Sequence, residues 1–341
     1  MKPTSLLPLL ALAAANAFNY KGDDAWPALQ KAIADYPKFH ASELEKIKKG
    51  DTSARFLILT AYHGLGNRER SMMSGFAFAL ANRLALFIDF PTAECDALAD
   101  RKHVACNPAE LHNMYKEPPF HWTAVSKCRD RSKINGMHDV CIGKTRVRGG
   151  NVIDLRDYNA EEIVRRGGVH KIGPRVLMHS DHTMLKYVVC DNGVRKTRLF
   201  PPDFFAAQRQ IEAFLLRPSK DVRERADTAL KAAGGCAVGL HLRGKEDHHE
   251  RVDIILDDLE PALAAAPGGL FVLGDGNNVY LKKDIIKHAQ KRGIQVLEVE
   301  DSGQKGGLTS ALAENLVFSS CAMLVPTVRS SFFSIAAVRA A

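Results

Sequence analysis

The chain has 341 residues, which is enough for two domains that each hold a hydrophobic core. Its composition, 46% hydrophobic and 25% charged, is that of an ordinary globular protein. The formal net charge of +8 favours acidic partners, such as nucleic acid, a sugar nucleotide or an anionic membrane surface. Because basic and aromatic residues are not interleaved in any dense block, the sequence argues against binding of single-stranded nucleic acid.

The N-terminal residues have the pattern of a secretory signal peptide. Lys2 precedes an apolar run over residues 6–15, and Ala-Asn-Ala at residues 15–17 is a small-x-small cleavage site. The run is short for a spanning helix and contains Pro8, although a short uncleaved anchor is the alternative. We therefore expect residues 1–17 to direct the chain into the secretory pathway, to the Golgi or, after cleavage, to the medium.

The seven cysteines fall into two groups. Cys236 and Cys321 lie in apolar, strand-like runs, so we expect buried free thiols there. The others lie in polar, loop-like sequence, where an oxidising compartment favours disulfides: Cys95, Cys106, Cys128, Cys141 and Cys190. Spacing does not define connectivity, so the pairs Cys95–Cys106 and Cys128–Cys141 are a working assignment that leaves Cys190 open. The sequence has no paired C-x-x-C or H-x-x-x-H motif for zinc.

The next part of the chain predicts a helical segment and then a βαβ unit. Residues 18–54 are polar and Lys-rich, and we expect a helical stem or a layer packed on the first domain. Residues 55–60 predict a buried strand, and Gly-Leu-Gly-Asn-Arg at residues 64–68 predicts a turn. A helix with one apolar face and a second strand over residues 84–90 complete the unit.

The Gly-rich turn is the candidate contact with an acceptor or a cleft. Gly64 and Gly66 permit positive φ and close approach of a ligand. Asn67 and Arg68 lie near the expected helix N-terminus, where an anion or a sugar hydroxyl can be held. The turn lacks the Gly-Lys-Ser/Thr of a Walker A loop and the third glycine of G-x-G-x-x-G. A turn with a structural role only is the alternative.

Residues 91–200 carry short patterns, and we expect a loop-rich insertion that determines substrate specificity. Residues 152–155 and 185–189 are candidate strands or short helices. The scattered histidines of this region are expected to lie on the surface or in structural hydrogen bonds: His112, His121, His138, His170, His179 and His182.

From residue 200 the chain alternates helices and strands. Two proline-bounded helices come first, and the later helices are predicted over residues 257–265, 280–292, 308–319 and up to Ala340. Strands are predicted at residues 236–242, 269–275, 294–299 and 322–325. This alternation predicts a parallel sheet with helices on both faces, and the helices around residues 200–218 join two α/β halves.

The strand that begins at Cys236 ends in a burst of charge that includes His241, Arg243, Lys245 and Asp247. Ligands of open α/β sheets bind outside the carboxyl ends of the strands, and arginine holds phosphate oxygens bidentately. The cluster therefore predicts an anionic ligand such as a pyrophosphate. A solvated strand exit with surface charges is the alternative.

Three blocks of the sequence, in this order, resemble the plant xyloglucan-type α-1,2-fucosyltransferases and the wider superfamily of α-1,2-, α-1,6- and protein O-fucosyltransferases. They are Gly-Leu-Gly-Asn-Arg with the following residues to Asp89, Pro218-Ser219 with the His-Leu-Arg that ends at Arg243, and residues 312–332. Together they cover about half of the chain. The resemblance implies a GT-B-like α/β fold, in which two Rossmann-like domains face a cleft. The acceptor domain would comprise residues 55–200 and the nucleotide-sugar donor domain residues 201–341.

The resemblance also implies a donor site. Its residues would be His241, Arg243, Lys245, Asp275, Glu314, Ser330, Ser331 and Phe332. Arg243 would hold the pyrophosphate and stabilise charge on the departing GDP, and the N-terminus of the last helix would face phosphate. The chain departs from the family at Gly244, where some members have a second arginine, and at Glu314, where aspartate is usual. The glycine that commonly follows Phe332 is also missing.

The implied activity is inverting transfer of fucose from GDP-fucose to a glycan hydroxyl, with Arg243 and Asp247 as catalytic residues. Other candidates for the base, on position alone, are Asp89, His63, His248 and His249. No Asp-x-Asp occurs at a strand end, so we expect no metal and no cofactor beyond the donor substrate. We expect no nucleic-acid partner, and membrane association only through an uncleaved N-terminal segment. The alternatives are a non-catalytic carbohydrate-binding pseudoenzyme and a glycosyltransferase of the same fold with another nucleotide sugar.

Overall fold

The part of the chain that the computed structural model describes consists of residues 26–61, 64–90, 109–124, 139–142, 145–148, 151–154, 174–180, 199–200, 204–242, 252–274, 279–299, 307–326 and 331–340. The chain divides into two compact units, a first unit at Gly22–Ser219 and a second unit that includes Lys220–Ala341. We expected the boundary at residue 200, but it lies between Ser219 and Lys220. The reason is that helix α8 (Phe204–Leu215) packs against helix α3 (Leu65–Asn82) of the first unit.

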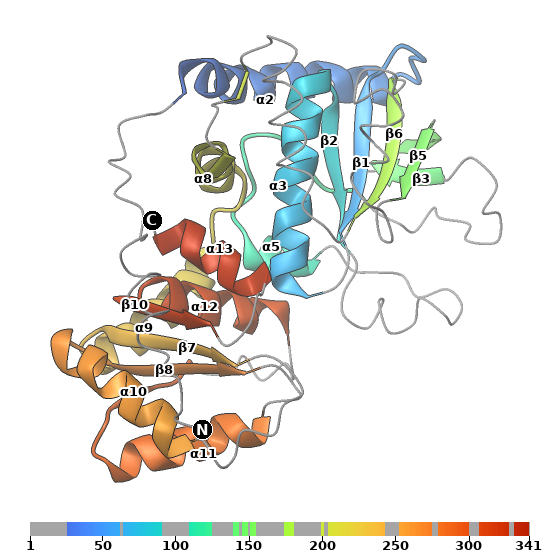
Figure 1. Ribbon diagram of the computed structural model, residues 1–341. Coiled ribbons are helices and arrows are strands. Elements are labelled where there is room, and N and C mark those ends of the chain that lie inside the picture. Colours follow the sequence, from blue (N-terminus) through green and yellow to red (C-terminus); the bar gives the residue numbers. More distant parts are fainter. Residues whose placement is uncertain are drawn as a thin grey trace, which may run out of the picture. The chain divides into compact units, whose positions relative to one another are not determined.

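The first unit is built on a four-stranded parallel sheet with the order β2-β1-β6-β5 (Figure 1). These strands are β1 (Phe56–Ala61), β2 (Ala85–Asp89), β5 (Asn151–Asp154) and β6 (Arg175–Ser180). The βαβ unit formed by β1, α3 and β2 is thus confirmed. The region expected to be a loop-rich insertion supplies two strands of the sheet, and β6 pairs with β1 along its whole length. It also supplies helix α5 (Ala109–Met114) and the antiparallel hairpin of β3 (Asp139–Ile142) and β4 (Thr145–Arg148).

The two faces of this sheet carry different layers. Helix α3 packs so closely on β1 that a Cβ atom at Gly75 would lie 2.8 Å from Leu59 Cδ2, so only glycine fits there without a shift. On the other face, helix α2 (Pro27–Lys48) and the hairpin share a core with strands β1 and β2 that includes Ile47, Phe56 and Val147. Residues 27–48 therefore form a layer of the first unit, which was the alternative to a stem.

Side chains of α2 and one extended segment satisfy the outer edge of β2. The Tyr36 hydroxyl accepts a hydrogen bond from Leu86 N–H and donates to Leu84 O. The His40 ring bonds Leu86 O through Nε2 at 2.9 Å. Further along, Ile88 bonds residues 122–124 through both its N–H and its carbonyl. The backbone groups that an edge strand leaves open are thus paired over the length of β2.

The second unit repeats the architecture with the strand order β10-β7-β8-β9, again all parallel. Its strands are β7 (Cys236–Leu242), β8 (Gly269–Gly274), β9 (Val296–Leu297) and β10 (Met323–Pro326). Its helices are α9 (Lys220–Ala232), α10 (Val252–Ala265), α11 (Val279–Lys291), α12 (Leu308–Ser319) and α13 (Ser331–Ala340). The alternation of helix and strand predicted for this half is confirmed, and β9 is shorter than expected.

Helices cover both faces of this second sheet (Figure 1). One core contains α10 and α11 packed on β7 and β8, and the other contains α9, α12 and α13. Gly239 lets α12 approach β7, because a Cβ atom there would lie 2.5 Å from the Phe318 ring. The two parallel sheets with their helical layers make the fold GT-B-like α/β, as the resemblance to the fucosyltransferases implied.

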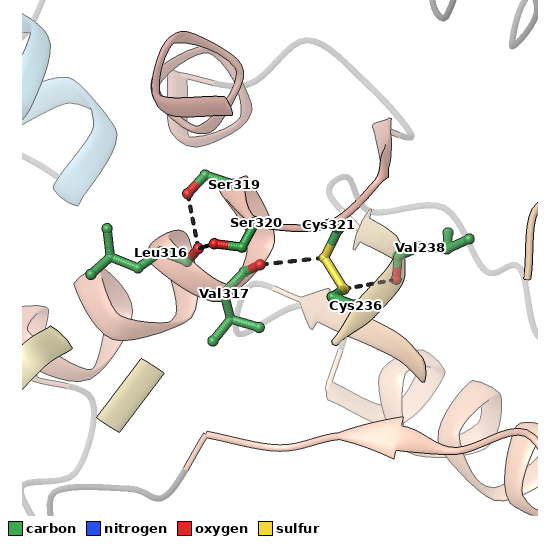
Figure 2. Close-up of a disulfide and its surroundings, with 7 residues drawn as sticks. All are labelled: Cys236, Val238, Leu316, Val317, Ser319, Ser320 and Cys321. Atoms are coloured by element: carbon green, nitrogen blue, oxygen red, sulfur yellow. Dashed lines mark hydrogen bonds between the residues drawn. A yellow bond between two sulfur atoms is a disulfide. The ribbon is translucent and has the colours of Figure 1, made fainter. Parts of the chain in front are cut away.

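Cys236 and Cys321 are buried as expected, but the expectation that they are free thiols is wrong. They form a disulfide across 85 residues, with the Cα atoms 4.5 Å apart (Figure 2). The register that pairs Val238 of β7 with Met323 of β10 brings the two cysteines opposite one another. The cysteines expected in bridges lie outside the described residues, except Cys141, whose backbone lies in β3. Among the helices of the described segments, none is long and apolar enough to cross a membrane.

Candidate functional site

The carboxyl edge of the second unit's sheet is where the donor residues were predicted. Leu242 of β7 and Gly274 of β8 are register partners and the last residues of their strands. His241 faces Pro326, the last residue of β10, on the other side. In the sequence, Arg243 and Asp275 follow directly after Leu242 and Gly274. The two side chains predicted to meet a nucleotide therefore come after the paired ends of neighbouring parallel strands, where α/β sheets bind ligands.

Several of the predicted residues lie outside the described segments: Arg243, Lys245, Asp247, Asp275 and Ser330. Ser331 and Phe332 are the first two residues of α13, so the predicted start of the last helix is correct. Their roles toward a nucleotide, like those of the others, stay predictions.

His241 lies almost buried at the penultimate position of β7, with 7% of its surface exposed. Its ring is 6.1 Å from that of Phe318 on α12, measured between centroids. His241 is thus packed between the strand and α12, on the sheet face where Gly239 makes room for the same helix. This position holds the end of β7 against α12, two residues before Arg243.

Glu314 lies on α12 and has a partner on α11. Its carboxylate is 3.8 Å from Lys282 Nζ, and both side chains are about one third exposed, at 33% and 30%. Next to it, Asn315 is fully buried and accepts a hydrogen bond from Arg339 Nη1 of α13. Neither pair was predicted. The Asn315–Arg339 pair fixes α13, whose first turn contains Ser331 and Phe332, against α12.

At the carboxyl edge of the first unit's sheet, Thr60 and Asp89 are register partners at the ends of β1 and β2. The Thr60 hydroxyl donates to Asp89 Oδ2 at 3.3 Å, and both residues are buried. Asp89 was a candidate base on position alone. The structure adds that a hydroxyl donor orients this carboxylate.

Arg68 is fully buried near the start of α3, although we expected it to contact the acceptor or a cleft. Its Nη1 donates to Ala61 O at 3.1 Å, and its guanidinium lies 4.8 Å from the centre of the Phe90 ring. These contacts join the residue that ends β1 to the residue that follows β2. Arg70 lies two residues further along α3, and its partial burial lowers the pKa of its guanidinium group. The contacts shown for Arg68 are structural, and a role toward an acceptor stays a prediction.

The glycines of the turn do not have the backbone conformation for which we expected them. Gly64 is the N-cap of α3 with φ −66°, and Gly66 lies inside the helix, so neither has a positive φ. Helical and extended conformations are open to any residue, and the expectation was wrong on this point. A Cβ atom at Gly64 would meet nothing within 4 Å. Asn67 N–H and Arg68 N–H both donate to Gly64 O, which closes the first turn of the helix.

A buried polar pair behind this turn was not predicted. Glu69 is fully buried and accepts a hydrogen bond from the Tyr115 hydroxyl at 2.6 Å. Tyr115 in turn meets Trp122 edge to face, with ring centroids 6.4 Å apart. The pair anchors the start of α3 to residues 115–122, so the helix N-terminus at the sheet edge is rigidly placed.

Over the described segments there is no group of three or more His, Cys, Asp or Glu side chains that could hold a metal ion.

Comparison with known proteins identifies the fold. No family model matches the sequence, and no curated protein matches it. Among solved structures, a mutant of Arabidopsis thaliana FUT1 in complex with GDP is similar over 100% of this chain and 83% of its own, with a TM-score of 0.61 and 16% identity. The α-1,6-fucosyltransferase NodZ soaked with GDP-fucose is similar over 83% of this chain and 91% of its own, with a TM-score of 0.51 and 15% identity. The structure of NodZ from Bradyrhizobium is similar over the same shares of the two chains, 83% and 91%, with a TM-score of 0.50 and 14% identity. The chain therefore has the fold of fucosyltransferases.

Proposed function

We propose that this chain is a glycosyltransferase that moves fucose from GDP-fucose to a glycan hydroxyl with inversion. The observation that carries the proposal is the likeness of the whole chain to a fucosyltransferase in complex with GDP. A second neighbour was soaked with GDP-fucose. Strands β7 and β10 are neighbours in one sheet. The His-Leu-Arg block lies at the end of β7 and the last helix, α13, follows β10, so both reach the same sheet edge, which supports a donor site in the second unit.

In this proposal Arg243 neutralises the diphosphate and stabilises the charge that develops when the bond to the sugar breaks. Lys245 and the N-terminus of α13 add positive potential at the same sheet edge. The hydroxyl of the acceptor attacks the anomeric carbon from the opposite side, and its proton goes to a base. Asp247 and Asp89 are the carboxylate candidates, and Asp89 has the Thr60 hydroxyl to orient it.

Calorimetry with the purified protein tests the proposal. Binding of GDP and GDP-fucose but not of UDP-sugars, together with release of GDP when an acceptor glycan is added, supports fucosyl transfer. Preference for another nucleotide sugar supports a different transferase of this fold. Binding of glycans without any nucleotide binding supports a pseudoenzyme. Either of the last two results contradicts the proposal.

We also propose that the protein works in the secretory pathway. The support is the signal-like pattern of residues 1–17 and the Cys236–Cys321 disulfide, since disulfides persist in oxidising compartments and are rare in the cytosol. A C-terminal reporter fusion tests this. Fluorescence in the endoplasmic reticulum, the Golgi or the medium is the expected result, and a uniform cytosolic signal contradicts it.

A further inference from the structure

Helix α11 of the second unit has three faces of different chemistry. Its apolar face packs into the core through Leu281, Ile285 and Ala289. His288 on a second face and Arg292, the residue after the helix, hold α11 against α10. His288 lies 3.3 Å from Asp253, and Arg292 bonds Asp253 at 2.8 Å and Asp257 at 2.5 Å. The pKa of Asp253 is lowered, first by His288 and then by Arg292. These two faces explain how the helix is held.

The third face consists of Tyr280, Lys283, Lys287 and Lys291, and we call it the lysine row. The spacing of three, four and four residues places these side chains on one side of the helix. All four are exposed, and Tyr280 is 75% exposed. Within the described part of the chain, none of the three lysine side chains has an ion-pair or hydrogen-bond partner. Asp284, the one carboxylate on the helix, is partly buried and has an interaction of its own.

The helix α2 offers a contrast within the same protein. There Lys31 pairs with Asp35 at 3.1 Å and Lys48 pairs with Glu45 at 2.6 Å. In the lysine row, residues at i and i+4 carry the same charge twice in succession, which destabilises a helix instead of supporting it. A row of negative charges laid along this face would remove that repulsion, and nothing in the packing of α11 requires lysine at these positions.

We propose that the lysine row binds a linear acidic polysaccharide. Four residues of helix span about 6 Å, so Lys283 and Lys291 lie about 12 Å apart in a straight line. This shape fits a chain of sugar rings with carboxylate or sulfate groups at intervals. Tyr280 at the end of the row presents an exposed aromatic face on which a sugar ring can stack. The choice of a glycan as the polymer rests on the proposed function, because the fold is that of enzymes that modify glycans.

The test measures binding of oligogalacturonate, heparin oligosaccharides and neutral dextran by fluorescence polarisation at several salt concentrations. The variant replaces Lys283, Lys287 and Lys291 by Gln. The matched control replaces Lys31, Lys48 and Lys220, which are exposed and paired, by Gln. Both variants lower the net charge of +8 by three. We expect the acidic oligosaccharides to bind and dextran not to bind. We expect the row variant to lose about tenfold or more in affinity and the control to lose less than about twofold.

Tyr280 is tested separately, because Tyr280→Ala should weaken binding while Tyr280→Phe keeps it. Equal losses in the two triple variants would show attraction by net charge alone and overturn the proposal. Tighter binding to phosphatidylserine vesicles or to single-stranded DNA than to the acidic oligosaccharides would also overturn it. Calorimetry of GDP binding to the same variants distinguishes the two proposals. Loss of polysaccharide binding with unchanged GDP affinity supports the lysine row as the binding site. Failure of the wild type to bind GDP contradicts only the proposed transfer reaction.

Discussion

The Tyr36 hydroxyl takes the place of a neighbouring strand at Leu86. It accepts the Leu86 N–H at 2.8 Å and donates its own proton to Leu84 O at 2.9 Å. Because the hydroxyl is buried, the pKa of Tyr36 lies above its ordinary value, although the hydrogen bond from Leu86 N–H acts in the opposite direction. One side chain of α2 thus completes the edge of the sheet and joins the two layers.

Replacing Tyr36 by Phe should destabilise the first unit by about 1–3 kcal/mol, because a buried N–H and a buried carbonyl lose their partner while the ring still fills its place. Urea unfolding followed by circular dichroism measures this. Tyr280→Phe, at a residue that is 75% exposed, is the matched control and should leave the midpoint unchanged. An unchanged midpoint for Tyr36→Phe would show that water replaces the hydroxyl at no cost.

His40 predicts a loss of stability in acid. Burial lowers its pKa from 6.5 to about 4, against a smaller opposing effect of its bond to Leu86 O. The unfolded chain therefore binds the proton more tightly, so stability is complete above about pH 6.5 and falls as the pH drops toward 4. At pH 5 the loss attributable to His40 should be about 2 kcal/mol relative to pH 7.5.

Urea midpoints at pH 7.5 and 5 test this effect. In His40→Gln the difference between the two pH values should shrink by that amount, and in His112→Gln, at an exposed position, it should match the wild type. If His40→Gln keeps the full pH dependence, other groups cause the acid sensitivity.

The disulfide should contribute to the stability of the second unit. Closing a loop of 85 residues lowers the entropy of the unfolded chain, which corresponds to about 4–5 kcal/mol in the chain-entropy model and more often to about 2–4 kcal/mol in measurement. The Cys236→Ala/Cys321→Ala variant should lose this amount, and dithiothreitol should lower its melting temperature less than that of the wild type. A wild type whose melting temperature ignores the reductant would contradict the assignment.

Reduced protein should keep its native packing at this site. Cys236 Sγ lies 3.6 Å from Val238 O, and Cys321 Sγ lies 3.3 Å from Val317 O. Dashed lines mark both contacts in Figure 2. After reduction each thiol would have a carbonyl acceptor in place. The loss therefore concerns the free energy of unfolding, and GDP affinity well below the melting temperature should not change.

Arg243 is the residue on which the proposed reaction depends most. Arg243→Ala and Arg243→Lys should fold normally and lose about 100- to 1,000-fold in transfer rate, since loss of one preorganised donor to developing charge costs about 3–4 kcal/mol. Lysine should not rescue the activity, because it is a point charge and cannot hold two phosphate oxygens in a plane. Arg223→Ala on the exposed side of α9 is the control. Wild-type turnover and GDP affinity in Arg243→Ala would remove the donor-site assignment.

The elements of the second unit could be predicted from the sequence because each is a local pattern with clear stops. The helix at 308–319, for example, has the bounds that were expected, and Gly293 with φ +74° ends the turn after α11. In the first unit, β6 was missed because its place beside β1 depends on pairing across more than 100 residues of chain, which no local pattern encodes. The candidate site follows the same division. The carboxyl edge of the second unit's sheet and the start of helix α13 could be predicted from the sequence. The contacts of Arg68 and the pairing of Asn315 with Arg339 could not, because they depend on tertiary packing.

The Cys236–Cys321 bond also changes the covalent topology of the second unit. It joins the start of β7 to the residues before β10, so α10, β8, α11, β9 and α12 all lie inside one closed ring of chain. A protease that cuts a single peptide bond within this ring produces a nicked protein of unchanged size on a non-reducing gel. The two pieces separate only after reduction, so a single clip in the ring need not release any part of the unit that carries the candidate donor site.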